Sequence, residues 1–218
     1  EGCASYAYRC VVLTYNWSVD RMCYMTNEYI RVRIQETARV AGLLEGQVTQ
    51  IVQIGDTLFE AWRLRKWVFI LGNGGSASTA THFTSDLVKT VNVDPEKYGI
   101  KAMALVDNSP LVSALTNDWG WDRVYESQLR TYSEPGSVVI GFSVHGGSGT
   151  EKAGAWSQNL LRGLQYAKDN GCKTIGFSGY DGGPMKTLVD TCVVAPGEST
   201  PHIESFNVVM ENMIKFEL

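Results

Sequence analysis

The chain has 218 residues, is 44% hydrophobic and carries a formal net charge of −4. A chain of this length and apolar content can bury a substantial core, and its sequence contains no linker-like stretch of low complexity. The acidic balance argues against non-specific binding of nucleic acid, so we expect no nucleic-acid partner.

Residues 1–26 begin with an acidic side chain and mix apolar, aromatic and small residues. They lack the basic start and uninterrupted apolar core of a signal peptide. We therefore expect an N-terminal appendage over residues 1–26 and a single domain over residues 27–218. The five cysteines are odd in number and have no CxxC spacing, so they predict neither a zinc knuckle nor a disulfide framework. A protein of the reducing cytoplasm, with no membrane partner, fits this pattern.

From Asn27 to Leu64 the apolar residues recur every three or four positions. This spacing predicts two amphipathic helices or one bent helix, which need a surface to cover. Their apolar positions exceed what one face of a sheet requires. We therefore expect a symmetric homodimer or homotetramer with these helices at the interface.

Beyond these helices, apolar runs alternate with helical patterns. Continuous apolar runs are typical of parallel strands that are covered on both faces. The strands are expected near residues 67–71, 101–106, 138–143, 173–178 and 191–195. The predicted fold class is therefore α/β, a three-layer αβα sandwich around a five-stranded parallel sheet, preceded by N-terminal helices.

The first of these strands runs into the sequence GNGGSAS, residues 72–78, which we call the first cradle. Glycines let an anion approach the backbone closely, and the serines add hydroxyl donors where the next helix begins. The helix dipole favours negative charge at the same place. The pattern predicts a phosphate site at Gly74, Gly75 and Ser76, and by itself leaves nucleotide and sugar phosphate equally open.

The strand near residues 138–143 is followed by SVHGGSGT, residues 143–150, which we call the second cradle. Any one such turn is compatible with an ordinary strand-to-helix connection. Two of them at the carboxyl ends of parallel strands favour a bound phosphate monoester. The residues expected to bind it here are Ser143, His145, Gly146 and Ser148.

Several motifs in chain order carry a resemblance to a known family. They are GNGGSAS followed by HF and DL, then LTNDWG, PGSVVIGFS and TIGFSGYDGG. Together they make the sequence similar to the SIS (sugar isomerase) domain family, and within it to the phosphoheptose (sedoheptulose 7-phosphate) isomerases. The resemblance implies a flavodoxin-like SIS fold, a phosphorylated sugar as ligand, and N-terminal helices that pack between subunits.

His82 and Asp86 lie one turn apart on the helix that follows the first cradle, so they can converge on a substrate or a metal. Isomerisation through an enediol needs a base near the carbon and a proton carrier for the oxygens. The resemblance implies a catalytic glutamate at the position of Asp86, which keeps the carboxylate on a shorter side chain. The alternative is a local hydrogen-bonded pair at a subunit contact.

The C-terminal helix departs from the family pattern. The resemblance implies an arginine, a glutamine and two histidines, and this chain has instead His202, Glu204, Asn207 and Asn212. The histidines supply metal ligation and the general base in the family, whereas asparagine cannot accept a proton near neutral pH. Our catalytic candidates are therefore Asp86, Glu204 and His202.

The same residues raise the question of a metal. His82, Asp86 and Glu204 could supply one nitrogen and two carboxylates to zinc or another divalent ion. Because these are only three ligands from distant segments, we expect no required cofactor and keep a divalent metal as the alternative. Amides and carboxylates beside a phosphate anchor can select hydroxyl stereochemistry. The residues expected in that role are Asn73, Asn117 and Asp118.

Two function classes stay open. One is a phosphosugar aldose–ketose isomerase that acts through an enediol. The other is a non-catalytic SIS module that binds a phosphosugar or docks a protein partner as a regulator. The cradles fit both classes, since fold alone does not decide function. Asp86 and Glu204 favour catalysis, while Asn207 and Asn212 favour the binding module.

Overall fold

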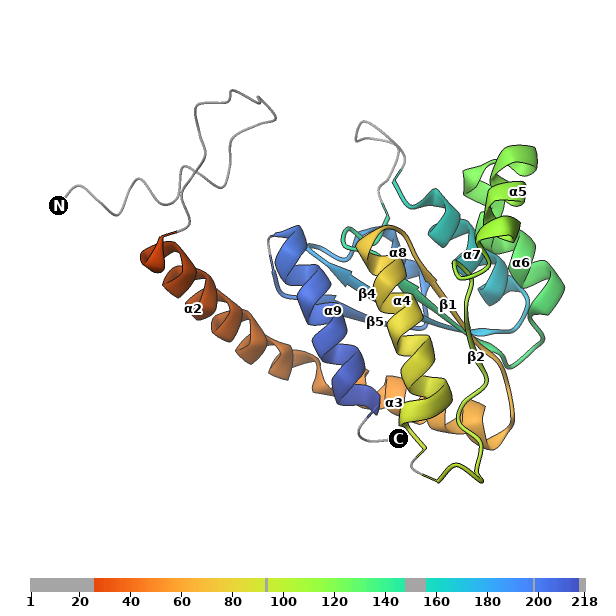
Figure 1. Cartoon of the computed structure of the whole chain (residues 1–218), viewed down its shortest axis with the longest axis horizontal. Coiled ribbons are helices and arrows are strands. Elements are labelled where there is room, and N and C mark those ends of the chain that lie inside the picture. Colours follow the sequence, from red (N-terminus) through yellow and green to blue (C-terminus); the bar gives the residue numbers. More distant parts are fainter. Residues whose placement is uncertain (1–25, 93, 148–155, 198, 216–218) are drawn as a thin grey trace. The chain divides into compact units, whose positions relative to one another are not determined.

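Figure 1 shows the computed structural model, which describes residues 26–92, 94–147, 156–197 and 199–215. It divides into two compact units, Glu1–Glu36 and Thr37–Leu218, and the division falls inside helix α2 (Asn27–Leu43). The appendage over residues 1–26 and the single domain over residues 27–218 stay predictions. Each unit is described by itself below, and the second contains the whole sheet.

The sequence predicted either two amphipathic helices or one bent helix from Asn27 to Leu64, and the described residues of this segment form two helices. A 3₁₀ turn, η1 (Leu44–Gln47), separates α2 from α3 (Val48–Arg63). The side chain of Gln47 accepts a hydrogen bond from the backbone N–H of Val194 at 2.7 Å and donates one to its carbonyl at 2.5 Å. Because Val194 lies in a strand at the sheet edge, Gln47 satisfies backbone groups that an edge leaves unpaired.

The predicted five-stranded parallel sheet is confirmed. Its strands are β1 (Val68–Gly72), β2 (Ala102–Ala104), β3 (Val138–Phe142), β4 (Lys173–Gly179) and β5 (Thr191–Ala195), in the order β2-β1-β3-β4-β5. Every residue of β1 and β3 is buried, which explains their uninterrupted apolar sequences. The strand order reverses between β1 and β3, and ligands of such sheets bind beyond the carboxyl ends of the strands at this switch point.

Helices cover both faces of the sheet, as the sandwich prediction requires. The remaining helical elements are α4 (Gly75–Ser85), η2 (Asp86–Thr90), α5 (Ser109–Trp119), η3 (Trp121–Arg123), α6 (Val124–Tyr132), α7 (Gln158–Asp169), α8 (Gly183–Leu188) and α9 (Thr200–Lys215). Alternate residues of each strand point to opposite faces. In β1, Ile70 therefore packs in one core cluster and Phe69 in the other.

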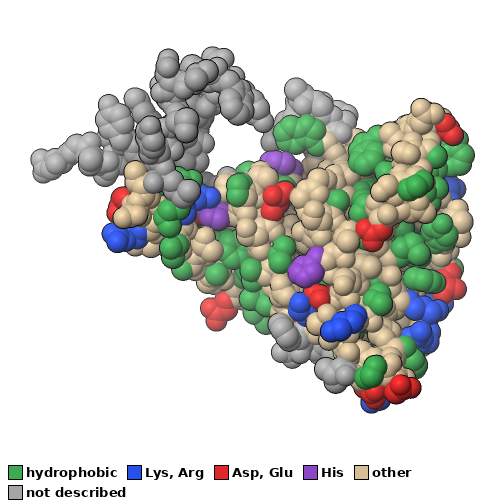
Figure 2. All heavy atoms as spheres, viewed as in Figure 1, with side chains coloured by type: hydrophobic (Ala, Val, Ile, Leu, Met, Phe, Trp, Pro, Cys, Tyr) green, Lys and Arg blue, Asp and Glu red, His purple; other side chains and the backbone are tan. Residues whose placement is uncertain are grey.

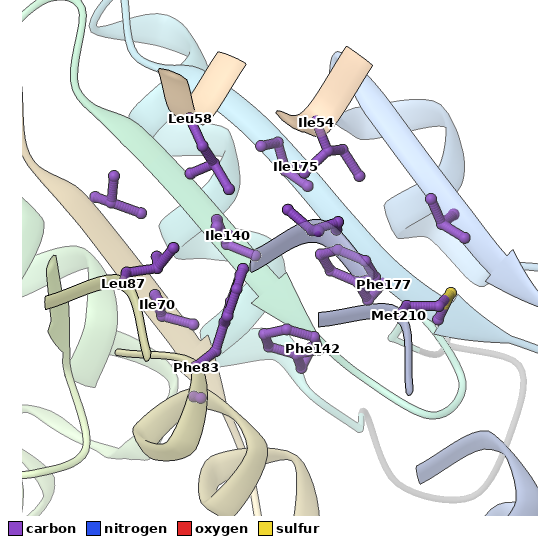
Figure 3. Packing of buried hydrophobic residues seen from close by; sticks show 14 of the residues in the cluster. Ile54, Leu58, Ile70, Phe83, Leu87, Ile140, Phe142, Ile175, Phe177 and Met210 are labelled. Carbon is purple, nitrogen blue, oxygen red and sulfur yellow. The ribbon is translucent and has the colours of Figure 1, made fainter. Parts of the chain in front are cut away.

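The first core cluster lies between the sheet and helices α3, α4 and α9. Ile54, Phe83 and Met210 come from those three helices and pack over strand residues that include Ile140 and Phe177 (Figure 3). This packing sets α4 and α9 side by side on one face of the sheet (Figure 1). Helices α6 and α7 cover the other face. In the part of the chain that the structure describes, no helix is long and apolar enough to cross a membrane.

Candidate functional site

The first cradle occupies the turn between β1 and α4. Gly74 has φ 56° and ψ −125°, a conformation that glycine adopts without a side-chain clash. The first backbone N–H groups of a helix have no partner within it, and no side-chain hydrogen bond from Gly74 caps those of α4 in the part of the chain that the structure describes. Ser76, in the first turn, is buried. This geometry suits an anion at the helix N-terminus, as the sequence predicts.

The side chain of Asn73 is held by other parts of the protein. It exchanges two hydrogen bonds of 2.9 Å with Asn159, and it accepts a third from the Tyr125 hydroxyl at 3.1 Å. That hydroxyl also donates to the carbonyl of Gly72, and burial raises the pKa of Tyr125 well above its usual range. Asn159 and Tyr125, which the sequence analysis missed, thus brace the first cradle. The predicted contact of Asn73 with sugar hydroxyls stays a prediction.

The second cradle is held against the loop that follows β4. The Ser143 hydroxyl accepts a hydrogen bond from the backbone N–H of Gly147 at 3.2 Å and donates to the Ser157 hydroxyl at 3.4 Å. Gly146 has φ 63°, and a Cβ at this position would collide with the carbonyl oxygen of Gly182. Only glycine therefore allows the two loops to approach this closely.

His145 packs in a small aromatic cluster at the second cradle. Its ring stacks on Tyr180, with centroids 4.6 Å apart, and its centroid is 5.2 Å from that of Trp156. Tyr180 has φ 52°, which is uncommon for a residue other than glycine and marks a conformation fixed by its surroundings. Ser148, the last predicted residue of this cradle, lies outside the described residues.

A hollow of about 410 Å³ opens between α4 and α9. It is lined by Gly75, Ser78, Thr79, His82, Glu204, Ser205 and Val208. The Glu204 carboxylate lies against Gly75, where a Cβ would collide with its Oε1 atom. The structure therefore brings Gly75, His82 and Glu204, all predicted from the sequence, to one surface. Figure 2 shows histidine, acidic and basic side chains near one another on this face of the molecule.

Asp86 is buried in η2, a single π turn that continues α4. Its Oδ2 atom accepts a hydrogen bond of 2.6 Å from the Lys215 ammonium, and the same atom is 3.5 Å from Nε2 of His82. Burial acts to raise the pKa of Asp86, but hydrogen bonds from Lys215 and Thr90 outweigh it and hold that pKa below its usual value. Asp86 is thus an ionised, paired carboxylate, which suits a structural or ligating role better than proton transfer.

Glu211, a residue that the sequence analysis missed, is fully buried on α9. Its Oε1 atom is 2.7 Å from Nδ1 of His82, but without hydrogen-bond geometry, and neither carboxylate oxygen has a hydrogen-bond partner among the described residues. Burial and the charge of Asp86 raise the pKa of Glu211 to about 8, against the opposing effect of Lys215. Glu211 follows Glu204 by seven residues, a spacing that places both on one face of a helix and could have indicated it.

His82, Asp86 and Glu211 form a group in which the potential ligand atoms all lie within 4.8 Å of one another. The set predicted from the sequence had Glu204 in place of Glu211. One imidazole nitrogen and two carboxylates suit zinc or a similar divalent ion. The carboxylate oxygens of Glu211 accept no hydrogen bond from the described residues, which is consistent with a ligand role. The donor set therefore fits a metal, although Lys215 already bonds to one of its members.

Comparison with known proteins places the chain in a family. A family model described as SIS domain matches residues 34–179. The chain belongs to the SIS domain family. A phosphoheptose isomerase from Aliarcobacter butzleri is 33% identical over 180 residues, which cover 83% of this chain and 88% of that protein. The Lincomycin biosynthesis protein LmbN from Streptomyces lincolnensis is 37% identical over 161 residues, 72% of this chain and 57% of that protein.

A solved structure shares the fold of this SIS domain. The phosphoheptose isomerase from Francisella tularensis matches 88% of this chain and 97% of its own with a TM-score of 0.79, at 19% sequence identity. The family model and the relative from Aliarcobacter butzleri confirm the resemblance read from the sequence, to SIS domains and within them to phosphoheptose isomerases.

Among the predicted residues that do not line the hollow are His202, Asn117 and Asp118. His202 is buried, with its Nδ1 atom 3.0 Å from the Ser199 hydroxyl and its Nε2 atom 3.4 Å from the Thr37 hydroxyl. Both ring nitrogens thus face hydroxyl partners, an arrangement typical of a structural histidine. Asn117 and Asp118 bond to each other at 2.7 Å on the exposed surface of α5.

Proposed function

We propose that this SIS domain is a phosphosugar isomerase that interconverts an aldose phosphate and a ketose phosphate through an enediol. The observation that supports it most is the Glu204 carboxylate at the N-terminus of α4, lining the same hollow as His82. A phosphate held by the adjacent cradle would place the sugar carbons within reach of both groups. The similarity to phosphoheptose isomerases supports a phosphorylated sugar as substrate.

The cradles supply the binding step. Backbone N–H groups at the start of α4, with the Ser76 hydroxyl, would hold the phosphate, and the glycines leave room for it. The Ser143 loop lies beyond the neighbouring strand β3 and would close the other side. Fixing the phosphate holds the reacting carbons near the catalytic groups, which lowers the entropic part of the barrier.

Glu204 and His82 supply the chemistry. The Glu204 carboxylate takes the proton from the hydroxyl-bearing carbon next to the carbonyl, and the C–H electron pair forms the double bond of the enediol. His82 protonates the carbonyl oxygen and removes the proton from the neighbouring hydroxyl. Glu204 then returns its proton to the former carbonyl carbon, which completes the isomerisation. Asp86 and His202 have no part in these steps, because neither side chain lines the hollow that holds Glu204 and His82.

His82, Asp86 and Glu211 are the residues that would hold a divalent ion, and an ion held there would replace His82 as the group that stabilises charge on the sugar oxygens. Such an ion, when bound, polarises a sugar oxygen as a Lewis acid. The proton transfers themselves are assigned to the side chains of this chain.

One observation favours a second function, a non-catalytic module that binds a phosphosugar or docks a protein partner. Asn207 is 1% exposed, and neither atom of its amide has a hydrogen-bond partner among the described residues. Asn207 and Asn212 stand where the resemblance implies histidines. A regulator needs the cradles but no base at these positions.

The test measures binding and chemistry separately. Purified protein is incubated with five- to eight-carbon sugar phosphates, and exchange of the C2 proton of each sugar is followed by NMR. Thermal unfolding of the protein is measured in parallel with the same ligands. We expect exchange with at least one of them, and a free energy of stabilisation of roughly 2.7 kcal/mol at about 100 times the dissociation constant. The unphosphorylated sugar and the Ser76→Ala/Ser143→Ala double variant should show little stabilisation. Binding without exchange for every sugar phosphate would instead support the regulator.

We also propose that the protein forms a homodimer or homotetramer through α3. Val48, Val52, Phe59 and Trp62 of this helix are exposed and alternate with its buried residues at intervals typical of a helix-packing seam. Light scattering at micromolar concentration should give at least twice the mass of one chain. A Phe59→Glu/Trp62→Glu variant should shift that mass toward the monomer, and a wild-type monomer would contradict the proposal.

A further inference from the structure

Lys215 lies at the end of α9 with its side chain only 10% exposed. Lysine is almost never buried without a partner, because its ammonium loses hydration. Its partner here is Asp86, whose Oδ2 atom is 2.6 Å from the ammonium and whose side chain is 8% exposed. The pair is therefore shielded from solvent, which strengthens the attraction between the two charges relative to an exposed pair.

The same Asp86 oxygen belongs to the candidate metal group. Oδ2 of Asp86 is 3.5 Å from Nε2 of His82, and the other ring nitrogen of His82 is 2.7 Å from Glu211. A divalent ion among these three side chains would have to share Asp86 with the ammonium. Two cations this close, in a place of low exposure, repel each other strongly.

We propose that Lys215 is a built-in cation that competes with a divalent metal ion for Asp86. In the metal-free protein the ammonium neutralises Asp86 and keeps α9 joined to η2. Metal binding then requires the ammonium to leave, so the affinity of the wild-type protein for the ion is weak. This inference does not depend on the proposed isomerase activity, because metal binding reports on it directly.

Lys215→Met keeps most of the apolar stem and removes the charge, while Lys215→Arg keeps the charge. Isothermal titration with Zn²⁺ should show that Lys215→Met lowers the dissociation constant by about tenfold or more. Lys215→Arg should bind as weakly as the wild type. The absorption spectrum of Co²⁺ should change in Lys215→Met at a lower cobalt concentration than in the wild type. An equal dissociation constant in Lys215→Met and the wild type would overturn the proposal.

Further measurements test whether a variant is misfolded and whether the metal ion binds at a different site. Circular dichroism checks the fold of each variant, and Lys215→Gln replaces Lys215→Met if the latter does not fold. Adding Asp86→Asn to the charge-removing variant should abolish the gain in affinity, whereas a gain that persists would locate the metal elsewhere and overturn the proposal. A sub-micromolar dissociation constant for Zn²⁺ in the wild-type protein would contradict it without any variant.

Discussion

Replacing Glu204 with glutamine should lower kcat for sugar phosphate isomerisation by roughly 10² to 10⁴-fold, the scale expected for loss of a general base. The amide keeps the shape of the side chain beside Gly75 and its hydrogen-bonding capacity, but it cannot take a proton from carbon. Binding of the sugar phosphate should stay nearly unchanged, because the cradle supplies it. The rate of C2 proton exchange and the ligand-induced shift in Tm measure the two effects separately.

Two variants make the result specific to Glu204. Glu96→Gln removes an exposed carboxylate from a different part of the surface and should leave both kcat and binding at the wild-type level. His202→Ala tests the alternative base. If it alone abolishes exchange while Glu204→Gln retains wild-type kcat, the imidazole is the base and the assignment of Glu204 is wrong.

The sheet could be predicted from sequence because its signals are local. Strand β1 is a continuous apolar run, and Gly74 marks the turn after it through a conformation that only glycine adopts easily. The carboxyl-edge position of both cradles follows from these signals and from the parallel order of the strands. The same holds for the helical period of α3, whose buried Ile54 and Leu58 face the sheet.

The metal group could be predicted only in part, because it depends on how α4 and α9 pack. His82 and Asp86 are four residues apart, a spacing visible in the sequence. Which carboxylate of α9 meets them depends on the register of two helices far apart along the chain. In the structure Glu204 meets Gly75 at the start of α4, and Glu211 meets His82 further along it. The helical repeat alone identifies both glutamates as candidates and cannot choose between them.

For a related reason, the sequence did not identify Lys215 as the partner of Asp86. Lys215 lies 129 residues further along the chain, and charged residues near the end of a helix are common on solvated surfaces. Its side chain is buried here because η2 brings Asp86 under the end of α9. Burial of this kind depends on how helices pack in three dimensions, and the local sequence does not show it. Asn73 shows the same limit, since its partners Asn159 and Tyr125 come from distant helices.

Glu211 should make the stability of the metal-free protein fall as pH rises. Its pKa is about 8 in the folded state, against an ordinary value of 4.5, so between these values the folded protein binds more protons than the unfolded chain. The contribution of a raised pKa to the free energy of unfolding is fully present below about pH 4.5 and is lost as pH rises through about 8. A shift of this size corresponds to a few kcal/mol.

Glu211→Gln removes this titration and keeps the size of the side chain. The free energy of unfolding of the wild type and of Glu211→Gln can be measured with urea in the presence of a metal chelator, from pH 5 to pH 9 in steps of about one unit. The difference between the two free energies should change with pH. The wild type should lose stability relative to Glu211→Gln as pH rises, and Glu96→Gln should follow the wild-type curve. Parallel curves for wild type and Glu211→Gln would mean that Glu211 has no raised pKa. That outcome would require a cation or water to stabilise the charged carboxylate, whose oxygens accept no hydrogen bond from the described residues.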